Sequence, residues 1–306
     1  MLNFVSGAAV PAILCGSLLA QCTGKLDQRF GDTGGILVSD LRISGTASLS
    51  SEQIHRIAST LLGHCFNEDN NELKERLRNE FQNRGYFQVE VQSLDVKVVD
   101  PLLTPKPVVL AFAANQGPRY KTGEITFVDN HAFTTAQLRD GFRLKRGDWF
   151  SREKIGAGLA SLVKLYGASG HLDSWSVPDT EFGSENTNNL KVTINEGPQY
   201  RMGKLEVIAP KELAEKITAQ WALSEGAVFD RTYPEKFLQD HRHLFPSGFQ
   251  PDHIELSRDC RDLTANMRLP IDSMDPRSHT PFTDSGCAPP KYKLEEFYEH
   301  QRSPDS

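Results

Sequence analysis

The segment Asp240-His241-Arg242-His243 contains the residue types best suited to chemistry, because two imidazoles and a carboxylate could bind a metal ion. Metal ligands must converge on one point, and residues two apart do not face each other on a helix. We therefore expect this segment to form a solvated helix surface. The segment Gly156-Ala157-Gly158 could suggest a phosphate-binding loop, but no strand directly precedes it. We predict no catalytic or metal site, and we expect no cofactor.

The cysteines are the next candidates for chemistry, and the chain has five of them. No two stand in a Cys-x-x-Cys pair, so a zinc site of the usual spacing is absent from the sequence. In an exported protein Cys260 and Cys287 could form a disulfide. The alternative is that both remain free thiols.

Composition sets limits on the partners of the protein. The 306 residues include 34 basic and 40 acidic side chains, which give a net charge of −6 without any basic run. Nucleic-acid binding therefore has no electrostatic support. A chain of this length has room for two to three domains, at roughly 100–200 residues each.

The first 20 residues carry no charge and are mostly apolar or small. We interpret residues 1–21 as a secretory signal or anchor segment, although no positive charge precedes Lys25. The sequence from Leu18 to Cys22 resembles a lipoprotein signal, with Gln21 where a small residue is expected, so Cys22 is a candidate for lipidation. Cleavage, lipidation and retention as an anchor interrupted by Pro11 all remain open.

The strands that would position these residues are marked by a sequence motif that recurs at a fixed period. A Gly-Pro-x-Tyr-x-x-Gly segment begins at Gly117 and returns 80 residues later at Gly197. Apolar residues alternate after each copy, which is typical of a half-buried strand. The stretch from Val38 to Ile43 predicts a similar strand without the Gly-Pro start.

The same landmarks follow each of these strands. A Gly-x-x-Phe segment precedes a predicted helix, and a second glycine follows 22, 23 or 22 residues after the first. The phenylalanines are expected in the core, the next residues at helix N-termini and the second glycines at helix ends. These positions are Phe66, Phe150 and Phe229; Asn67, Ser151 and Asp230; and Gly85, Gly170 and Gly248.

Two strand-like stretches close each repeat, so the order is β-α-α-β-β three times. We therefore predict an α+β protein with three tandem modules, each a three-stranded mixed sheet covered on one face by two helices. The expected domains are residues 34–116, 117–196 and 197–272, and we expect each to fold separately. Residues 273–306 are predicted to form a disordered tail, because Pro, Ser, Thr and Asp dominate its first part.

Together, the Gly-Pro-x-Tyr-x-x-Gly start, the Gly-x-x-Phe segment and the closing glycine resemble POTRA (polypeptide-transport-associated) domains. The resemblance covers about residues 34–272. It implies periplasmic modules, as in the BamA- and TamA-like assembly factors of the outer membrane, which bind unfolded or partner polypeptides largely through a sheet edge. It implies as partners outer-membrane β-barrel proteins or their assembly machinery, with membrane association through a partner or the N-terminal segment.

The predicted strand order leaves the second strand of each module at a sheet edge, where unpaired backbone groups can add another strand. The candidate polypeptide-binding residues are Asp173, Ser174, Trp175, Ser176 and Val177 in the middle module, and Gln88, Val89, Glu90 and Val91 in the first. The ring of Trp175 could anchor an incoming strand or lie buried under the helices.

Three hypotheses about function follow. The first is a non-enzymatic periplasmic scaffold, associated with the outer membrane, that binds polypeptides by strand addition. The second is the soluble part of a split or truncated barrel protein, because the 34 residues after Asp272 show no barrel-like alternation. The third is an enzyme or small-ligand binder on the same fold, for which the sequence nominates no site.

Overall fold

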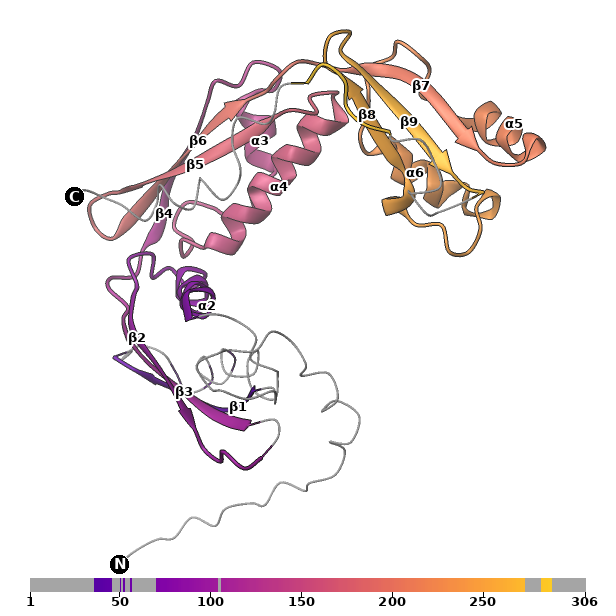
Figure 1. The fold of residues 1–306 in the computed structure, drawn as a ribbon. Coiled ribbons are helices and arrows are strands. Elements are labelled where there is room, and N and C mark those ends of the chain that lie inside the picture. Colours follow the sequence, from indigo (N-terminus) through magenta and orange to yellow (C-terminus); the bar gives the residue numbers. More distant parts are fainter. Residues whose placement is uncertain are drawn as a thin grey trace, which may run out of the picture. The chain divides into compact units, whose positions relative to one another are not determined.

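The computed structural model describes residues 36–45, 70–103, 106–272 and 282–287, together with Ser50, Glu52 and Arg56. The chain divides into two compact units. The first comprises residues up to Tyr120 together with Trp149–Arg152, and the second comprises Lys121–Asp148 and the residues from Glu153 onward. Figure 1 shows three separate sheets along the chain, one in the first unit and two in the second.

The first sheet has the order β1-β3-β2, formed by β1 (Ile36–Ser44), β2 (Glu90–Val98) and β3 (Lys106–Asn115). Strand β1 is parallel to β3, whereas β2 is antiparallel to it. Helix α2 (Asn70–Gln82) provides one helix of this repeat. Phe66 and Asn67, which were expected just before this helix, lie outside the described residues. So does most of the other expected helix, of which only Ser50, Glu52 and Arg56 are described.

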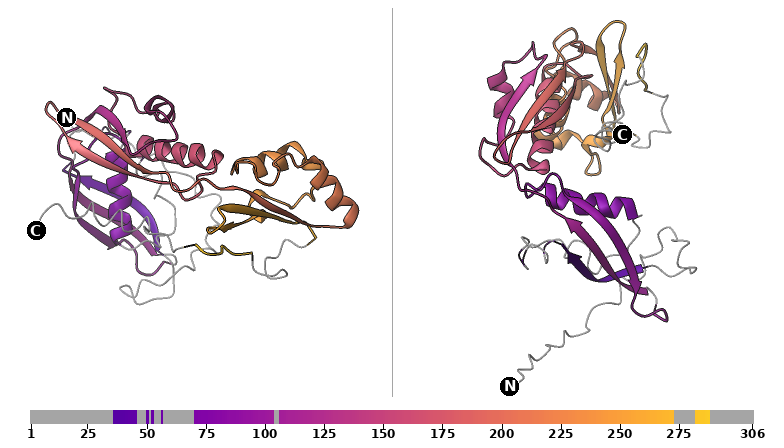
Figure 2. Two further views of the ribbon diagram at one scale, coloured as in Figure 1. Left: turned by 90° about the horizontal axis from the view of Figure 1, so that it is seen from above. Right: turned by 90° about the vertical axis from the view of Figure 1, so that its left-hand side faces the viewer.

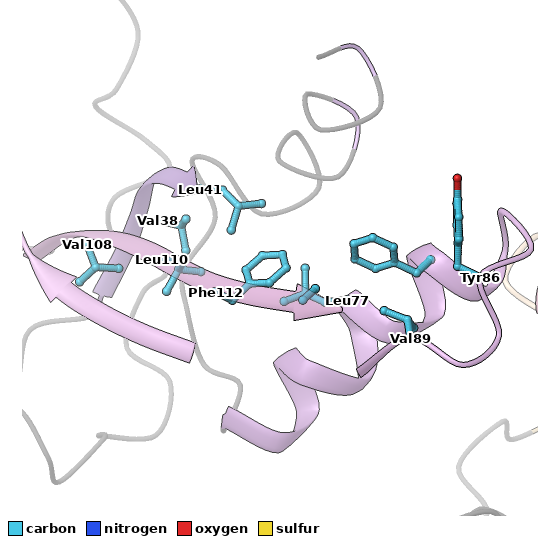
Figure 3. Close-up of a cluster of buried hydrophobic side chains, with 10 residues drawn as sticks. Val38, Leu41, Leu77, Tyr86, Val89, Val108, Leu110 and Phe112 are labelled. Carbon is cyan, nitrogen blue, oxygen red and sulfur yellow. The ribbon is translucent and has the colours of Figure 1, made fainter. Parts of the chain in front are cut away.

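One face of this sheet packs against α2 to form the core of the first unit. Figure 3 shows Leu77 of α2 among side chains of β1 and β3, with Tyr86 and Val89 from the segment before β2. Strand β3 alternates between buried and less buried residues, as expected for a strand with one face in a core. The buried residues are Val38, Leu41, Leu77, Phe81, Tyr86, Val89, Val108, Leu110, Phe112 and Ala114.

The second sheet has the order β4-β6-β5, formed by β4 (Lys121–Val128), β5 (Trp175–Phe182) and β6 (Thr187–Asn195). The predicted directions are confirmed, since β4 runs parallel and β5 antiparallel to β6. Helices α3 (Thr135–Asp140) and α4 (Arg152–Ala168) accompany this sheet. Thr134 caps α3 in a capping box with Gln137, as expected for threonine before a helix.

The third sheet repeats this order as β7-β9-β8, with β7 (Arg201–Ile208), β8 (Glu255–Asp259) and β9 (Thr264–Pro270). Helices α5 (Lys211–Gln220) and α6 (Tyr233–Asp240) lie on one face of the sheet (Figure 2). Two short 3₁₀ turns, η3 (Arg242–Leu244) and η4 (Pro251–His253), connect α6 to β8.

The predicted helix end at Gly248 is wrong. Helix α6 ends at Asp240, because η3 and then Pro246 replace its continuation, and a proline cannot continue a helical ladder. The other two predicted ends are confirmed, since Gly85 and Gly170 have φ angles of 96° and 83°. Such left-handed angles favour glycine.

The repeated tyrosine has the same backbone partners in both copies. In the first unit, the Tyr120 amide donates to the Gly85 carbonyl and the Tyr120 carbonyl accepts from Phe150, at 2.8 and 3.0 Å. In the second unit, Tyr200 makes the corresponding bonds with Gly170 and Phe229, at the same two lengths. The period in the sequence therefore reflects one repeated set of backbone contacts.

The second glycine of each motif lies where a neighbouring asparagine approaches. The Asn189 side-chain oxygen accepts from the Glu124 amide, and that of Asn266 accepts from Lys204, both at 2.8 Å. A Cβ atom on Gly123 or Gly203 would overlap these oxygens. The register shifts at the same place in β4 and β7, so the glycine belongs to a β-bulge.

The three predicted core phenylalanines are confirmed where the structure describes them. Phe150 and Phe229 are both fully buried. Phe150 belongs to the first compact unit, where its ring contacts Phe87 with 4.6 Å between ring centroids. Its neighbour Trp149 is 41% exposed, and the guanidinium carbon of Arg119 lies 3.6 Å from the centroid of its ring.

Candidate functional site

Strand β5 is an outer strand of the second sheet, as the predicted strand order requires. Trp175, Ser176 and Val177 are its first three residues and pair with the end of β6. Asp173 and Ser174 precede the strand, and the Ser174 amide donates to the His171 carbonyl at 3.4 Å. The predicted segment is therefore divided between a turn and the beginning of the edge.

The pairing register decides which way the edge residues point. Directly opposed residues of two strands share a face of the sheet. Trp175 pairs with the exposed Asn195, whereas Ser176 pairs with the buried Ile194 on the helix side. Trp175 therefore lies on the face away from the helices, where its side chain is half-buried.

Pro178 lies in the middle of β5, opposite Val192. Proline has no amide hydrogen and is tolerated in a sheet where its nitrogen faces away from the ladder. Backbone direction alternates along a strand, so the amides of Ser176 and Thr180 face outward like the nitrogen of Pro178. The edge thus presents outward amides before and after one interruption.

The first unit contains the other predicted edge. Glu90 and Val91 begin β2, and a register shift follows Val91. Gln88 and Val89 precede the strand; Val89 is buried, and the Gln88 side-chain oxygen accepts from the Tyr120 hydroxyl at 2.7 Å. This edge and the β5 edge lie in different compact units, so they are two separate candidate sites.

A third edge was not predicted as a site. Strand β8 is an outer strand of the third sheet, and the chain's own residues 282–287 lie beside it. The Ser285 amide donates to the Arg258 carbonyl at 2.8 Å, and the Cys260 amide donates to the Ser285 carbonyl at 2.9 Å. This is the pattern of a parallel strand. Over these six residues the structure differs from the expected disordered tail.

A disulfide between Cys260 and Cys287 holds this segment at the edge. It links the residue that follows β8 to the end of the described segment, with 5.0 Å between the two Cα atoms. The sequence left this pairing open, and the structure shows it formed. The cysteine pair was the signal that could have placed the segment beside β8.

Arg258 joins the edge segment to the turn before β5. Its guanidinium forms ion pairs with Asp284 and Asp173, and its amide donates to Asp284 at 2.8 Å. The hydrogen bond from Arg258 holds the pKa of Asp284 below its usual range, although partial burial opposes it. The Tyr200 hydroxyl donates to Asp173 at 2.5 Å. Burial is the main cause that raises the pKa of Tyr200, and this hydrogen bond raises it further.

Arg268 shows how the segment covers the open face of the third sheet. It lies on the face away from the helices, between Glu206 of β7 and Glu255 of β8, at 2.7 and 3.2 Å. The Phe282 ring lies 4.2 Å from its guanidinium. Arg268 is only 6% exposed, because these three side chains surround it.

Elsewhere, the described residues include no group of three His, Cys, Asp or Glu side chains placed to bind a metal ion. His241 follows α6 rather than lying on its surface, and its ring stacks on Phe237 with 4.3 Å between centroids. Gly158 lies within α4, where a Cβ atom would overlap the Phe142 ring. Its small size serves helix packing.

An open hollow of about 540 Å³ lies between α4 and α6 in the second unit. Its charged residues Lys164, Arg231, Glu235 and Lys236 are exposed rather than converging in a buried site. The hollow therefore resembles a surface groove more than an enclosed ligand site. None of the helices in the described part of the chain is long and apolar enough to cross a membrane.

Comparison with known proteins adds three findings. A sequence model of the family described as "POTRA: Surface antigen variable number repeat" matches residues 36–112 and 120–197, which together make up half of the chain. A protein of Treponema pallidum (strain Nichols), named as an outer membrane protein assembly factor, is 24% identical over 219 residues, covering 68% of this chain and 26% of that protein. The outer membrane protein assembly factor BamA of Neorickettsia risticii (strain Illinois) is 21% identical over 178 residues, covering 58% and 23%.

The chain thus spans about a quarter of the length of these curated relatives. Among solved structures, POTRA domains 3–5 of Haemophilus influenzae BamA match with a TM-score of 0.58 and 15% identity. The match covers 77% of this chain and 96% of that structure, so it includes more of the chain than the family model does. At this identity the likeness establishes the fold.

Proposed function

The chain belongs to the POTRA family, and from that premise we propose that it is a non-enzymatic polypeptide-binding scaffold in outer-membrane protein assembly. The names of the two curated relatives, both outer membrane protein assembly factors, support this role. The proposed location is the periplasm, in association with the outer membrane. The proposed partners are outer-membrane β-barrel proteins or their assembly machinery, and unfolded segments of such proteins.

The observation that carries the proposal is the outer position of β5 in a three-stranded sheet. Strand addition there would use the outward backbone groups of Ser176 and Thr180. Backbone hydrogen bonds do not depend on the sequence of the incoming chain, so this mode suits a varied set of extended clients. Trp175 and Val177 lie on the open face beside these groups and would contribute apolar contacts.

The experiment replaces one outward amide and leaves the rest of the strand intact. Ser176→Pro removes a donor that faces away from β6, whereas the matched Ser176→Ala variant keeps it. The probe is a fluorescent ten-residue peptide of alternating valine and threonine, titrated with the full chain. We expect the proline variant to bind at least about fivefold more weakly, the loss of roughly one backbone hydrogen bond, and the alanine variant to bind normally.

Hydrogen exchange of the β6 amides provides the control for folding, because β6 is the central strand and its amides pair with β5 on one side and β4 on the other. Equal binding by the proline and alanine variants, with β6 protection intact in both, would exclude the β5 edge as the docking site. The β2 edge would then be tested in the same way, starting at Glu90 and Val91.

A second candidate follows from the share of the relatives that the chain covers. Since it matches about a quarter of their length, its modules could act as the soluble part of an assembly factor whose other part is a separate protein. Affinity purification after crosslinking of the cell envelope tests this candidate. Recovery of one stoichiometric outer-membrane partner supports it, whereas recovery of many substoichiometric clients supports the general scaffold.

A further inference from the structure

Residues 282–287 use the outer edge of β8 as a strand-binding site. Three backbone groups of that edge are occupied, namely the Arg258 amide, the Arg258 carbonyl and the Cys260 amide. Two of them bond to the backbone of Ser285, and the third bonds to the Asp284 carboxylate. The contacts do not require that the incoming strand belong to the same chain.

Two side chains of the segment fit groups on the sheet. The Asp284 carboxylate accepts from the backbone and the guanidinium of Arg258. The Phe282 ring lies over Arg268, whose charge is already balanced by two carboxylates. An extended strand with an aromatic residue two positions before an aspartate therefore matches this edge in both charge and shape.

We propose that the outer edge of β8 is a strand-addition site for extended acidic polypeptide segments of the pattern Phe-x-Asp, in parallel orientation. Residues 282–287 occupy it as a tethered ligand, and the Cys260–Cys287 disulfide excludes a competing chain while it is closed. The proposal concerns a different strand from β5. It goes beyond the proposed function and does not depend on peptide binding at that edge.

The disulfide determines how well a free peptide can compete with residues 282–287 for the edge of β8. A segment tied to the end of β8 has a high effective concentration at its own site, so a free peptide competes poorly. A dithiol opens the bond by exchange: its thiolate attacks one sulfur, forms a mixed disulfide and releases the other cysteine as a thiolate. Its second thiol then displaces the remaining cysteine, so two electrons pass to the cysteine pair and the reductant becomes a cyclic disulfide.

The test uses the full chain and the double variant Cys260→Ser/Cys287→Ser. The probe is a fluorescent peptide with the sequence of residues 276–290 and serine in place of Cys287. We expect the double variant to bind this peptide at least about tenfold more tightly than the oxidised wild type does, since the disulfide no longer holds the segment at the edge and only the backbone after β9 still connects it. Reduction with dithiothreitol should bring the wild type to the level of the variant and leave the variant unchanged.

A matched peptide with asparagine in place of Asp284 tests the recognition itself without altering the protein. It should bind the double variant severalfold more weakly, because the charge-assisted bonds to Arg258 are lost. Equal binding of the two peptides, or equal binding by the oxidised and reduced wild type, would overturn the proposal.

Hydrogen exchange separates this site from β5 and from global unfolding. In the double variant the backbone amides at positions 260 and 285 should exchange faster than in the oxidised wild type, while those of β9 remain protected. Unchanged protection of both amides would mean that the segment does not depend on the disulfide, which contradicts the proposed control. Introducing Ser176→Pro should not change peptide binding at β8, so failure at β5 and failure here can be distinguished.

Discussion

Strands β5 and β8 have the same place in two repeats of one fold, but different features protect their outer edges. Strand β5 runs over eight residues and is interrupted by Pro178. Strand β8 runs over five residues and is covered by residues 282–287 of the same chain. An exposed edge is a template for unwanted pairing, and proteins protect such edges with proline, charge or a covering segment. The comparison shows two of these solutions in adjacent repeats.

The two edges are connected through one charged cluster. Arg258 of β8 contacts both Asp284 of the covering segment and Asp173 of the turn before β5. Leu172, from the same turn, packs against a buried cluster of the third repeat that includes Tyr200 and Met202. Arg258 therefore joins the covering segment to the turn that precedes β5, and the following predictions compare the two edges.

The largest expected effect comes from the disulfide, which has no equivalent in the described part of the β5 repeat. It closes a loop with a sequence separation of 27 residues. The chain-entropy relation gives about 3.5 kcal/mol for a loop of that length, so Cys260→Ser/Cys287→Ser should lower the unfolding free energy of the third repeat by up to about this amount. Calorimetry of the full chain measures the shift.

Reduction of the wild type should reproduce this loss, and the same reductant should have no effect on the double variant. If the double variant is as stable as the wild type, the reduced segment would have to hold the edge by its hydrogen bonds alone. That result would make the β8 edge more similar to β5 than we infer.

Arg258→Met is expected to have the next largest effect. It leaves the carboxylates of Asp173 and Asp284 without their ion-pair partner, and both are about two-thirds shielded from solvent. We expect a loss of about 2 kcal/mol, discounted for the remaining exposure. Arg146→Met, at an exposed arginine of the same unit, is the matched control and should change stability little. An equal effect of both substitutions would show that the ion pairs of Arg258 with Asp173 and Asp284 do not stabilise the fold measurably.

Acid should weaken the covering segment before it affects β5. The pKa of Asp284 is lowered from its ordinary value of 3.8, chiefly by its bond to Arg258. A lowered carboxyl pKa contributes stability that is complete above the unfolded-state value and is lost as pH falls through the folded-state value, below 3.8. We expect about 1 kcal/mol of segment stability to disappear in that range.

Exchange of the Ser285 amide, followed from pH 5 down to pH 2.5 and corrected for intrinsic rates, measures this loss. Asp284→Asn is the control, because it should remove the pH dependence and give the weaker protection throughout. A wild-type amide that keeps the same corrected protection across this range would contradict the assigned role of Asp284.

Local patterns in the sequence predicted the repeats and the outer position of β5. The Gly-Pro-x-Tyr-x-x-Gly motif works because Tyr120 and Tyr200 bond to the closing glycines, and because Gly123 and Gly203 lie beside asparagine side chains. Both requirements recur at the same positions of each repeat, so the residue types that meet them recur in the sequence at a regular spacing. The direction of Trp175, in contrast, follows from the strand register, which the sequence left open.

The covering segment could not be predicted, because its own composition does not favour structure. Residues 282–287 contain one large apolar side chain, Phe282, and their contacts come from Arg258, Cys260 and Arg268. These partners lie about 15–30 positions away in the sequence and provide no periodic signal. The early end of α6 has a similar explanation, since the region around Pro246 is determined by tertiary packing of Phe245 and Phe249.

The smallest expected effect concerns the interruption of β5. If Pro178 prevents continuous pairing along that edge, Pro178→Thr should restore one outward amide donor between those of Ser176 and Thr180. One additional backbone hydrogen bond should improve binding of the alternating valine–threonine peptide by about 0.5–1 kcal/mol, or roughly two- to fivefold. Because the nitrogen at this position faces away from β6, the stability of the sheet should change little.

Pro178→Gly, which also restores the amide but loosens the strand, should improve binding less. Peptide affinity that stays the same in Pro178→Thr but falls in Ser176→Pro would place docking at the beginning of β5 alone, near Trp175, rather than along the whole strand.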